Sequence, residues 1–119
     1  MTQNSREALI ELLFLSLYLD DHLSLAEDDV LTTALDSLGW ESGNSREKHV
    51  FRSFALARAT YEDPAKCDEF LKERAAIFKS DGEEAAAITW LSKVLGSDGL
   101  TFMEKRFLTQ LEALLFPQV

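Results

Sequence analysis

Acidic side chains recur at the same spacing in two segments of this chain, 77 residues apart. Residues 21–27 read Asp-His-Leu-Ser-Leu-Ala-Glu and residues 98–104 read Asp-Gly-Leu-Thr-Phe-Met-Glu, so both follow the pattern Asp-x-Leu-[Ser/Thr]-x-x-Glu. Carboxylate oxygens are the ligands that hard divalent cations such as Ca²⁺ and Mg²⁺ prefer. The repeated pattern therefore suggests cation binding by the turn aspartates together with neighbouring acids.

The same residues also have a purely structural explanation. Ser24 and Thr101 are typical helix N-caps, and the glutamate three residues after each of them completes a capping box. A glutamate that binds a backbone amide has fewer lone pairs left for a metal ion, so spacing alone favours caps over ligands. An EF-hand is excluded, because its twelfth loop position would be Leu31 or Thr109 instead of a bidentate glutamate.

Apolar helices must hold these two turns in place. Under the 77-residue shift, Phe14 aligns with Leu91 before the turn, and Leu31 aligns with Leu108 after it. The repeated unit is therefore a helix-turn-helix hairpin, and two copies are too few for a solenoid. Prolines and glycines are scarce, and no segment alternates with the period of a strand. The predicted fold is all-α, a compact array of about six helices with a duplicated acidic hairpin.

Apolar periodicity and turn residues place the individual helices. They are expected over residues 6–19, from after Ser24 to Gly39, over 46–61, from Asp63-Pro64 to 80–82, over 83–95 and over 102–116. The first is apolar around most of its circumference, which predicts that it lies at the centre of the fold or in a dimer interface. In the third, the expected buried side consists of Val50, Phe51, Phe54, Ala57 and Tyr61.

Length and charge limit the classes of function. The 119 residues suit one domain, residues 1–119, whose core needs no disulfide or metal. The net charge is −9, and residues 1–45 hold nine of the 21 acidic residues while Arg6 is their only base. Such a chain repels nucleic acids, and the asymmetry indicates a cation or a basic partner. Solubility alone would explain the charge equally well.

The cellular location follows from the apolar run and the cysteine. Residues 9–19 include Glu11 and Ser16 and are too few to span a bilayer, so no membrane association is expected. Cys67, the one cysteine, cannot form an intramolecular disulfide, which is typical of a reducing, cytoplasmic environment. The thiol is expected to be buried and unreactive.

The remaining candidate residues do not form a catalytic set. His49 lacks a recognisable nucleophile or orienting partner in the sequence, so it is predicted to be a surface histidine and the chain to be non-enzymatic. Trp40 and Trp90 are expected to pack against helices, because no basic patch surrounds them. Four basic residues are expected to pair with the acidic N-terminal third, within the chain or across a dimer: Arg46, Lys48, Arg52 and Arg58.

The second hairpin resembles the tellurite-resistance TerB-like family. The resemblance lies in Leu95-Gly-Ser-Asp98-Gly99-Leu100-Thr101-x-x-Glu104 after an apolar helix, and it covers residues 8–38 and 84–115. The first turn departs from the family pattern, since it has Asp-His where Asp-Gly is usual. The resemblance implies an all-helical protein with an acidic metal-binding face and a role in stress or metal-oxyanion response. By position it nominates as metal ligands Asp21, Glu27, Asp98 and Glu104, with Asp20 and Asp28 as outer candidates.

Two functional hypotheses result. In the first, the chain is a non-enzymatic TerB-like protein whose acidic turns bind a divalent cation of the Ca²⁺ or Mg²⁺ type. In the second, it is a protein-interaction or dimerisation module, and the acidic turns are only helix caps. The second draws support from the apolar surface of the first helix, which a partner would cover if the chain itself did not.

Overall fold

The computed structural model describes residues 1–19, 28–95 and 102–117. Within these residues the chain consists of helices and short connections, which confirms the predicted all-α fold. The helices are α1 (Gln3–Leu19), α2 (Asp28–Leu38), α3 (Arg46–Thr60), α4 (Pro64–Asp81), α5 (Glu84–Leu95) and α6 (Phe102–Leu115).

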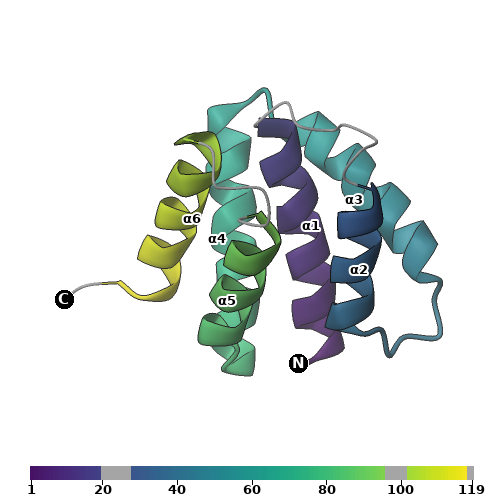
Figure 1. Ribbon diagram of the computed structural model, residues 1–119. Helices are drawn as coiled ribbons and strands as arrows, with labels where there is room; N and C mark the ends of the chain where they lie inside the picture. Colours follow the sequence, from purple (N-terminus) through teal and green to yellow (C-terminus); the bar gives the residue numbers. More distant parts are fainter. Residues whose placement is uncertain (20–27, 96–101, 118–119) are drawn as a thin grey trace.

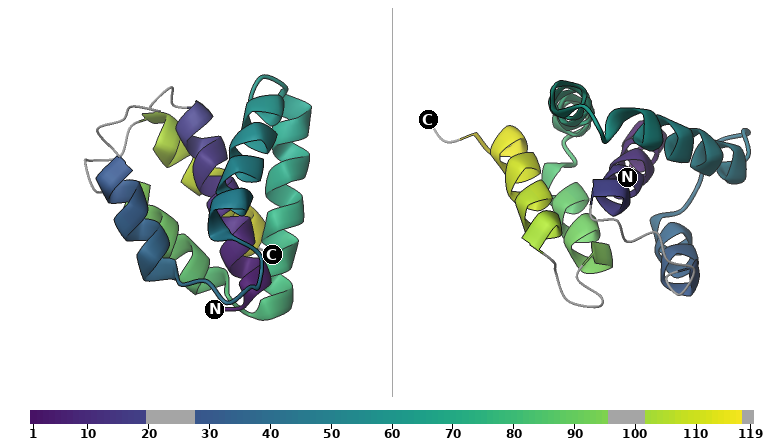
Figure 2. Two further views of the ribbon diagram at one scale, coloured as in Figure 1. Left: turned by 90° about the vertical axis from the view of Figure 1, so that its right-hand side faces the viewer. Right: turned by 90° about the horizontal axis from the view of Figure 1, so that it is seen from above.

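Helix α1 occupies the centre of the molecule (Figure 1). In that view α3 and α4 lie behind α1, α2 and α5 lie in front of it, and α6 lies at the outer side of α4 and α5, as the side and top views also show (Figure 2). The enclosed residues of α1 are Ser5, Ala8, Leu9, Ile10, Leu12, Leu13, Phe14, Leu15 and Ser16. The chain's own helices thus cover the apolar surface of α1. The central position is confirmed, and the alternative position in a dimer interface is wrong.

The two copies of the repeat form the hairpins α1–α2 and α5–α6. Positions related by the 77-residue shift are buried in both copies, as in the pairs Phe14 with Leu91 and Leu38 with Leu115. The hairpins also contact each other, because α2 packs against α5 and α1 packs against both α5 and α6. Helices α3 and α4 come between the copies in sequence and complete the enclosure of α1.

The start of α4 has the predicted cap. Asp63 Oδ1 accepts hydrogen bonds from the backbone N–H groups of Ala65, at 3.0 Å, and Lys66, at 3.4 Å. Pro64 follows at the first helical position, where its missing N–H costs nothing. This sequence signal was sufficient to place the start of the helix.

Glycines end α2 and α4 in the left-handed region of backbone conformation. Gly82 has φ +69°, and the N–H of Glu83 donates to the carbonyl of Phe78 at 2.9 Å, which closes a Schellman motif after α4. Gly39 has φ +82° directly after α2, as its predicted role as a C-cap requires.

The predicted buried side of α3 is wrong for Phe51 and Phe54, which are 77% and 37% exposed. The buried residues of this helix are His49, Ser53, Ala57 and Thr60. Two of them are hydroxyl residues whose donors are satisfied within the helix, since Ser53 Oγ donates to the carbonyl of His49 at 2.8 Å. Thr60 Oγ1 makes the equivalent bond to the carbonyl of Leu56 at 2.7 Å. Back-bonding of this kind makes a hydroxyl compatible with burial.

The N-terminus is held at the turn between α4 and α5. Helix α1 begins at Gln3, earlier than predicted, because Thr2 Oγ1 accepts from the N–H of Ser5 at 3.1 Å. Asp81 Oδ2 in turn accepts from the hydroxyls of Thr2 and of Ser5, the latter at 2.8 Å. These two donors hold the pKa of the Asp81 carboxyl below its usual value.

Truncation of the central helix should be costly. Leu12 is fully buried, so we expect Leu12→Ala to lower the free energy of unfolding by about 2–5 kcal/mol through lost burial and the cavity left behind. Leu56→Ala is the control, because Leu56 is 39% exposed, and its effect should be no more than about 0.5 kcal/mol. Urea denaturation measures both, and equal effects would contradict the central role of α1.

The contact at Asp81 should give stability a specific pH dependence. Because its folded pKa is lowered, the ionised carboxylate contributes stability above its ordinary pKa of 3.8, and this contribution is lost as pH falls through the folded value. We therefore expect Asp81→Asn to lower the melting temperature at pH 7 and to lose this effect near pH 2. Asp68→Asn, at an exposed position of the same helix, controls for the loss of one charge. If Asp81→Asn lowers the melting temperature by the same amount at pH 7 and near pH 2, the ionised Asp81 carboxylate is not the source of this stability.

Candidate functional site

The structure describes only part of the predicted metal site. Asp20, Asp21, Glu27 and Asp98 lie outside the described residues. Asp28 is the first residue of α2, and Glu104 lies in the first turn of α6, where it is buried. A carboxylate at that position suits the positive end of the helix dipole. Among residues 1–19, 28–95 and 102–117, no three His, Cys, Asp or Glu side chains are grouped so that they could hold a metal ion.

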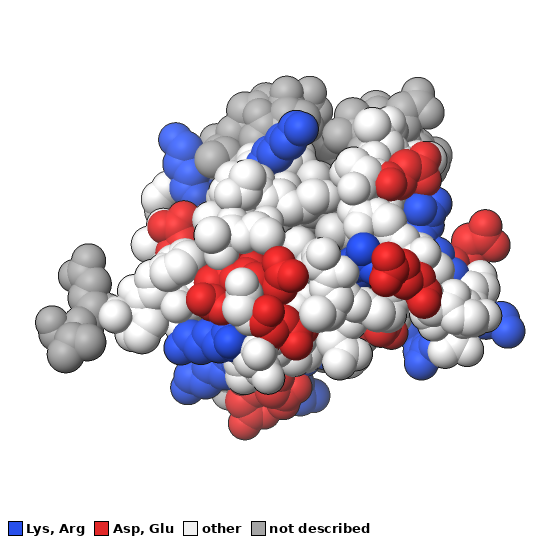
Figure 3. Space-filling view, turned by 90° about the horizontal axis from the view of Figure 1, so that it is seen from below, with Lys and Arg blue, Asp and Glu red and all other residues white. Residues whose placement is uncertain are grey.

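The helix ends on either side of the two acidic turns lie at one end of the molecule. The C-terminal ends of α1 and α5 and the N-terminal ends of α2 and α6 all face the top of the view in Figure 1. The opposite end holds the N-terminus and the turn between α4 and α5, where Figure 3 shows acidic side chains gathered on the surface. Both hairpins therefore run in the same direction.

A polar cluster joins α1 to α3 inside the molecule. His49 is only 6% exposed, so the prediction of a surface histidine is wrong. Its Nε2 lies 3.1 Å from the backbone carbonyl of Glu7, to which it donates, and its Nδ1 lies 3.7 Å from Glu7 Oε1. The Trp40 ring lies over the imidazole, with 5.6 Å between ring centroids. The partners that the sequence did not reveal come from α1.

The cluster continues from α1 to α4 through an ion pair. Arg74 Nε donates to Glu11 Oε2 at 3.1 Å, and Arg74 Nη1 donates to Glu73 Oε2 at 2.9 Å. The guanidinium also lies 3.7 Å from the centroid of the Phe70 ring. Glu7 and Glu11 are one helical turn apart on a mostly apolar helix, and this spacing was the available signal for an internal polar contact. The cluster contains no nucleophile, and its contacts orient three helices.

Arg6 connects α1 to the end of α2. Its Nε donates to the carbonyl of Leu38 at 3.1 Å, and its Nη1 lies 3.2 Å from Glu41 Oε2. A guanidinium at the C-terminal end of a helix satisfies a carbonyl that has no partner within the helix and interacts favourably with the helix dipole. The only base among residues 1–45 is therefore used to hold the first hairpin together.

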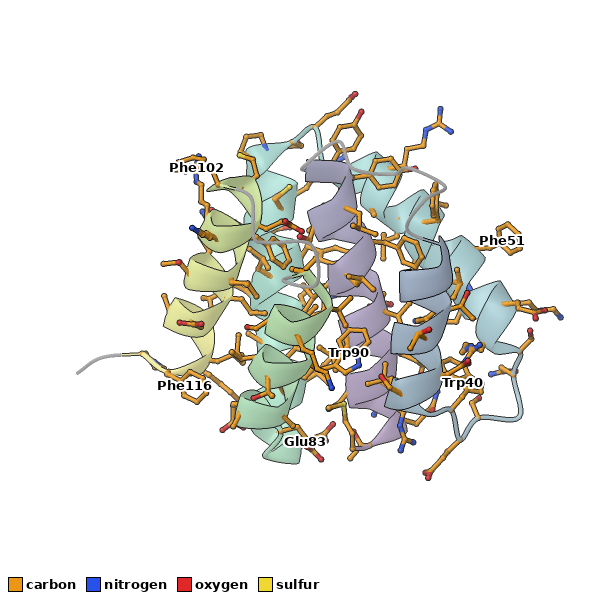
Figure 4. All side chains as sticks on the ribbon, viewed as in Figure 1. Trp40, Phe51, Glu83, Trp90, Phe102 and Phe116 are labelled. Atoms are coloured by element: carbon orange, nitrogen blue, oxygen red, sulfur yellow. The ribbon has the colours of Figure 1, made fainter. Side chains whose placement is uncertain are left out.

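The tryptophans pack as predicted. Trp40 and Trp90 are half-buried against the core, and both side chains lie within the body of the molecule in Figure 4. Trp40 Nε1 donates to the carbonyl of Asn44 at 2.7 Å, and Trp90 Nε1 donates to Ser37 Oγ at 3.3 Å. The second bond fixes α5 to α2.

Cys67 lies half-buried near the start of α4. Its Sγ lies 3.4 Å from the carbonyl of Thr60. Burial raises the pKa of the thiol, and the nearby carboxylates of Asp63 and Asp68 raise it further. A raised pKa leaves little thiolate at neutral pH, which agrees with the prediction of an unreactive thiol.

The basic segment on α3 separates into two parts. Arg46 Nη1 pairs with Asp36 Oδ1 at 3.0 Å, which confirms the predicted pairing with the acidic N-terminal third for this residue. Lys48, Arg52 and Arg58 are exposed on α3. Phe51 is exposed on the same helix, so α3 presents basic and aromatic groups together on its outer side.

The comparisons with known proteins leave the family assignment as a prediction. The chain matches no protein-family model, no curated protein and no solved structure. Among the described helices, none has both the length and the apolar composition needed to cross a membrane. The resemblance to TerB-like proteins therefore depends on the residues of the acidic turns.

The two carboxylates on Arg74 should differ in their contribution to stability. The Glu11 side chain is 19% exposed and that of Glu73 is 67% exposed. We expect Glu11→Gln to cost about 1–3 kcal/mol, because it removes a charged partner from a mostly buried guanidinium. Glu73→Gln, the matched control, should cost no more than about 0.5 kcal/mol. Double-mutant cycles with Arg74→Met, followed by urea denaturation, measure each coupling, and equal couplings would contradict this interpretation.

Proposed function

We propose that this chain is a non-enzymatic, TerB-like protein that binds a divalent cation of the Ca²⁺ or Mg²⁺ type through the carboxylates of its two acidic turns. The observation that supports this is the common direction of the two hairpins, which brings the helix ends beside both turns to the same end of the molecule (Figure 1). Ca²⁺ takes about six to eight oxygen ligands, more than one short turn supplies. Two turns at one end can contribute ligands jointly.

The aspartates and glutamates have different roles in this proposal. Asp21 and Asp98 precede the helix starts and supply ligand oxygens. Glu27 and Glu104 lie three residues into the capping boxes, where a carboxylate holds the backbone of the turn, and the burial of Glu104 is in keeping with that role. Asp20 and Asp28 add negative charge next to the first turn. From the resemblance to TerB-like proteins we propose that this activity serves a stress or metal-oxyanion response such as tellurite resistance.

Calorimetric titration of chelator-treated protein with Ca²⁺, Mg²⁺, Mn²⁺ and Zn²⁺ tests the proposal. We expect saturable heat and a higher melting temperature, since a ligand at about 100 times its Kd stabilises the folded state by about 2.7 kcal/mol. Asp21→Asn combined with Asp98→Asn should abolish both effects and leave the apo protein folded.

The matched control removes the caps and keeps the carboxylates. Ser24→Ala with Thr101→Ala should lower stability by about 1 kcal/mol for each cap, with or without cation. If millimolar cation gives neither heat nor a thermal shift to the unsubstituted protein, the metal site does not exist.

A second candidate, a protein-interaction module, is favoured by a different observation. The apolar surface of α1 no longer supports it, because that surface is enclosed. Instead the outer side of α3 exposes Phe51, and a large exposed aromatic side chain on a helix with exposed basic residues is a typical feature of a binding surface.

A further inference from the structure

The outer face of α3 combines a prominent aromatic residue with small ones. We define this face as Glu47, Lys48, Phe51, Arg52, Ala55, Arg58 and Ala59, all of which are exposed. Figure 4 shows the Phe51 side chain projecting away from the body of the molecule. Next to it is a shallow groove lined by Phe51, Phe54, Ala55, Arg58 and Ala59.

The shape of this face suits a helix. Phe51, Ala55 and Ala59 follow one another at intervals of four residues and so form a ridge along one side of α3. The two alanines project little from the helix, which lets a second helix approach closely, while Phe51 at one end offers a large surface to bury. A partner helix with an apolar stripe would fit along this ridge.

The charge of this face indicates which charge its partner should carry. Helix α3 carries four basic residues and one acid, Glu47, in a chain whose net charge is −9. Arg46 is paired with Asp36 of α2. The other three bases share the outer face with Glu47, which lies one turn before Phe51, so the face keeps a basic excess. A partner that places carboxylates beside Lys48, Arg52 and Arg58 gains charge complementarity, whereas a basic partner is repelled.

The same charges argue against a symmetric dimer through this face. A two-fold axis would place identical surfaces against each other. Such a contact would bring together six bases and only two acids, the Glu47 of each copy, and a net excess of like charge is destabilising. An acidic segment of a different protein, which can neutralise all three bases, is the better match.

We propose that the outer face of α3 is the docking site for an acidic amphipathic helix of another protein. This inference rests on the interaction-module candidate and is independent of cation binding. The apolar stripe of the partner covers Phe51, Ala55 and Ala59, and its flanking carboxylates pair with Arg52 and Arg58. Helix-in-groove recognition of this kind uses apolar anchors one turn apart and charges at the edges.

A pair of synthetic peptides tests the inference on the full-length chain. Each peptide has about 18 residues, or five helical turns, with leucines along one side. One carries glutamates at the remaining positions and the other carries lysines. Fluorescence anisotropy should show that the glutamate peptide binds at least about tenfold more tightly, and that the preference weakens at high salt.

Two exposed phenylalanines provide matched variants. Phe51 is 77% exposed on α3 and Phe102 is 78% exposed on α6, so neither substitution should impair folding. Phe51→Ser should weaken the glutamate peptide about tenfold, as expected for an aromatic anchor, and Phe102→Ser should change its Kd by less than about twofold. Arg52→Glu with Arg58→Glu should transfer the preference to the lysine peptide.

The peptide-binding results distinguish a failure of the acidic-helix inference from a failure of the interaction-module candidate on which it rests. If both peptides bind equally and both depend on Phe51, α3 is an interaction surface but the acidic partner is wrong. If neither peptide binds and sedimentation shows a monomer, the docking site and the interaction-module candidate are both overturned, while the cation titration still decides the first proposal. Self-association that Phe51→Ser abolishes would make a second copy the occupant and overturn the inference.

Discussion

The enclosure of α1 is the constraint on which the rest of this structure depends. An α-helix that is apolar on all sides can be stable in water only if neighbours cover its whole circumference, and one or two neighbours are too few. Helices α3, α4, α5 and α6 all contact α1, which leaves each of them with an outer side. The arrangement therefore has one central, mostly buried helix and a set of helices around it with one buried face each.

Polar groups on a buried helix must find partners, and on α1 those partners connect the surrounding helices. Arg6 binds the end of α2, the backbone carbonyl of Glu7 accepts from His49 on α3, and Glu11 binds Arg74 on α4. Each of these groups would be costly to bury without its partner. The mostly buried side chains of Arg6 and Glu11 thus favour α2 and α4, respectively, as neighbours on two sides of α1.

Most of the fold could be predicted from the sequence because its signals are local. Asp63-Pro64 and Gly82 set the limits of α4 through hydrogen bonds within a few residues, and the repeat predicted two equivalent hairpins. The buried face of α3 could not be predicted in this way. Its burial of His49 depends on Glu7, which is 42 residues away in sequence, and hydrophobicity alone selected Phe51 instead. The candidate cation site has the same limitation, since its ligands would come from turns 77 residues apart.

The insertion of α3 and α4 between the two copies of the repeat also separates the charges of the molecule. The first hairpin lies within the acidic part of the chain, whereas α3 carries a basic excess on a side that the repeat does not use. An acidic partner approaching the first hairpin is repelled, and one approaching α3 is attracted. The protein as a whole, with its net charge of −9, repels an acidic partner at long range, so the attraction of α3 acts only near contact and favours this face over the others without raising the association rate. An acidic protein with one basic helix can in this way be selective for an acidic helix.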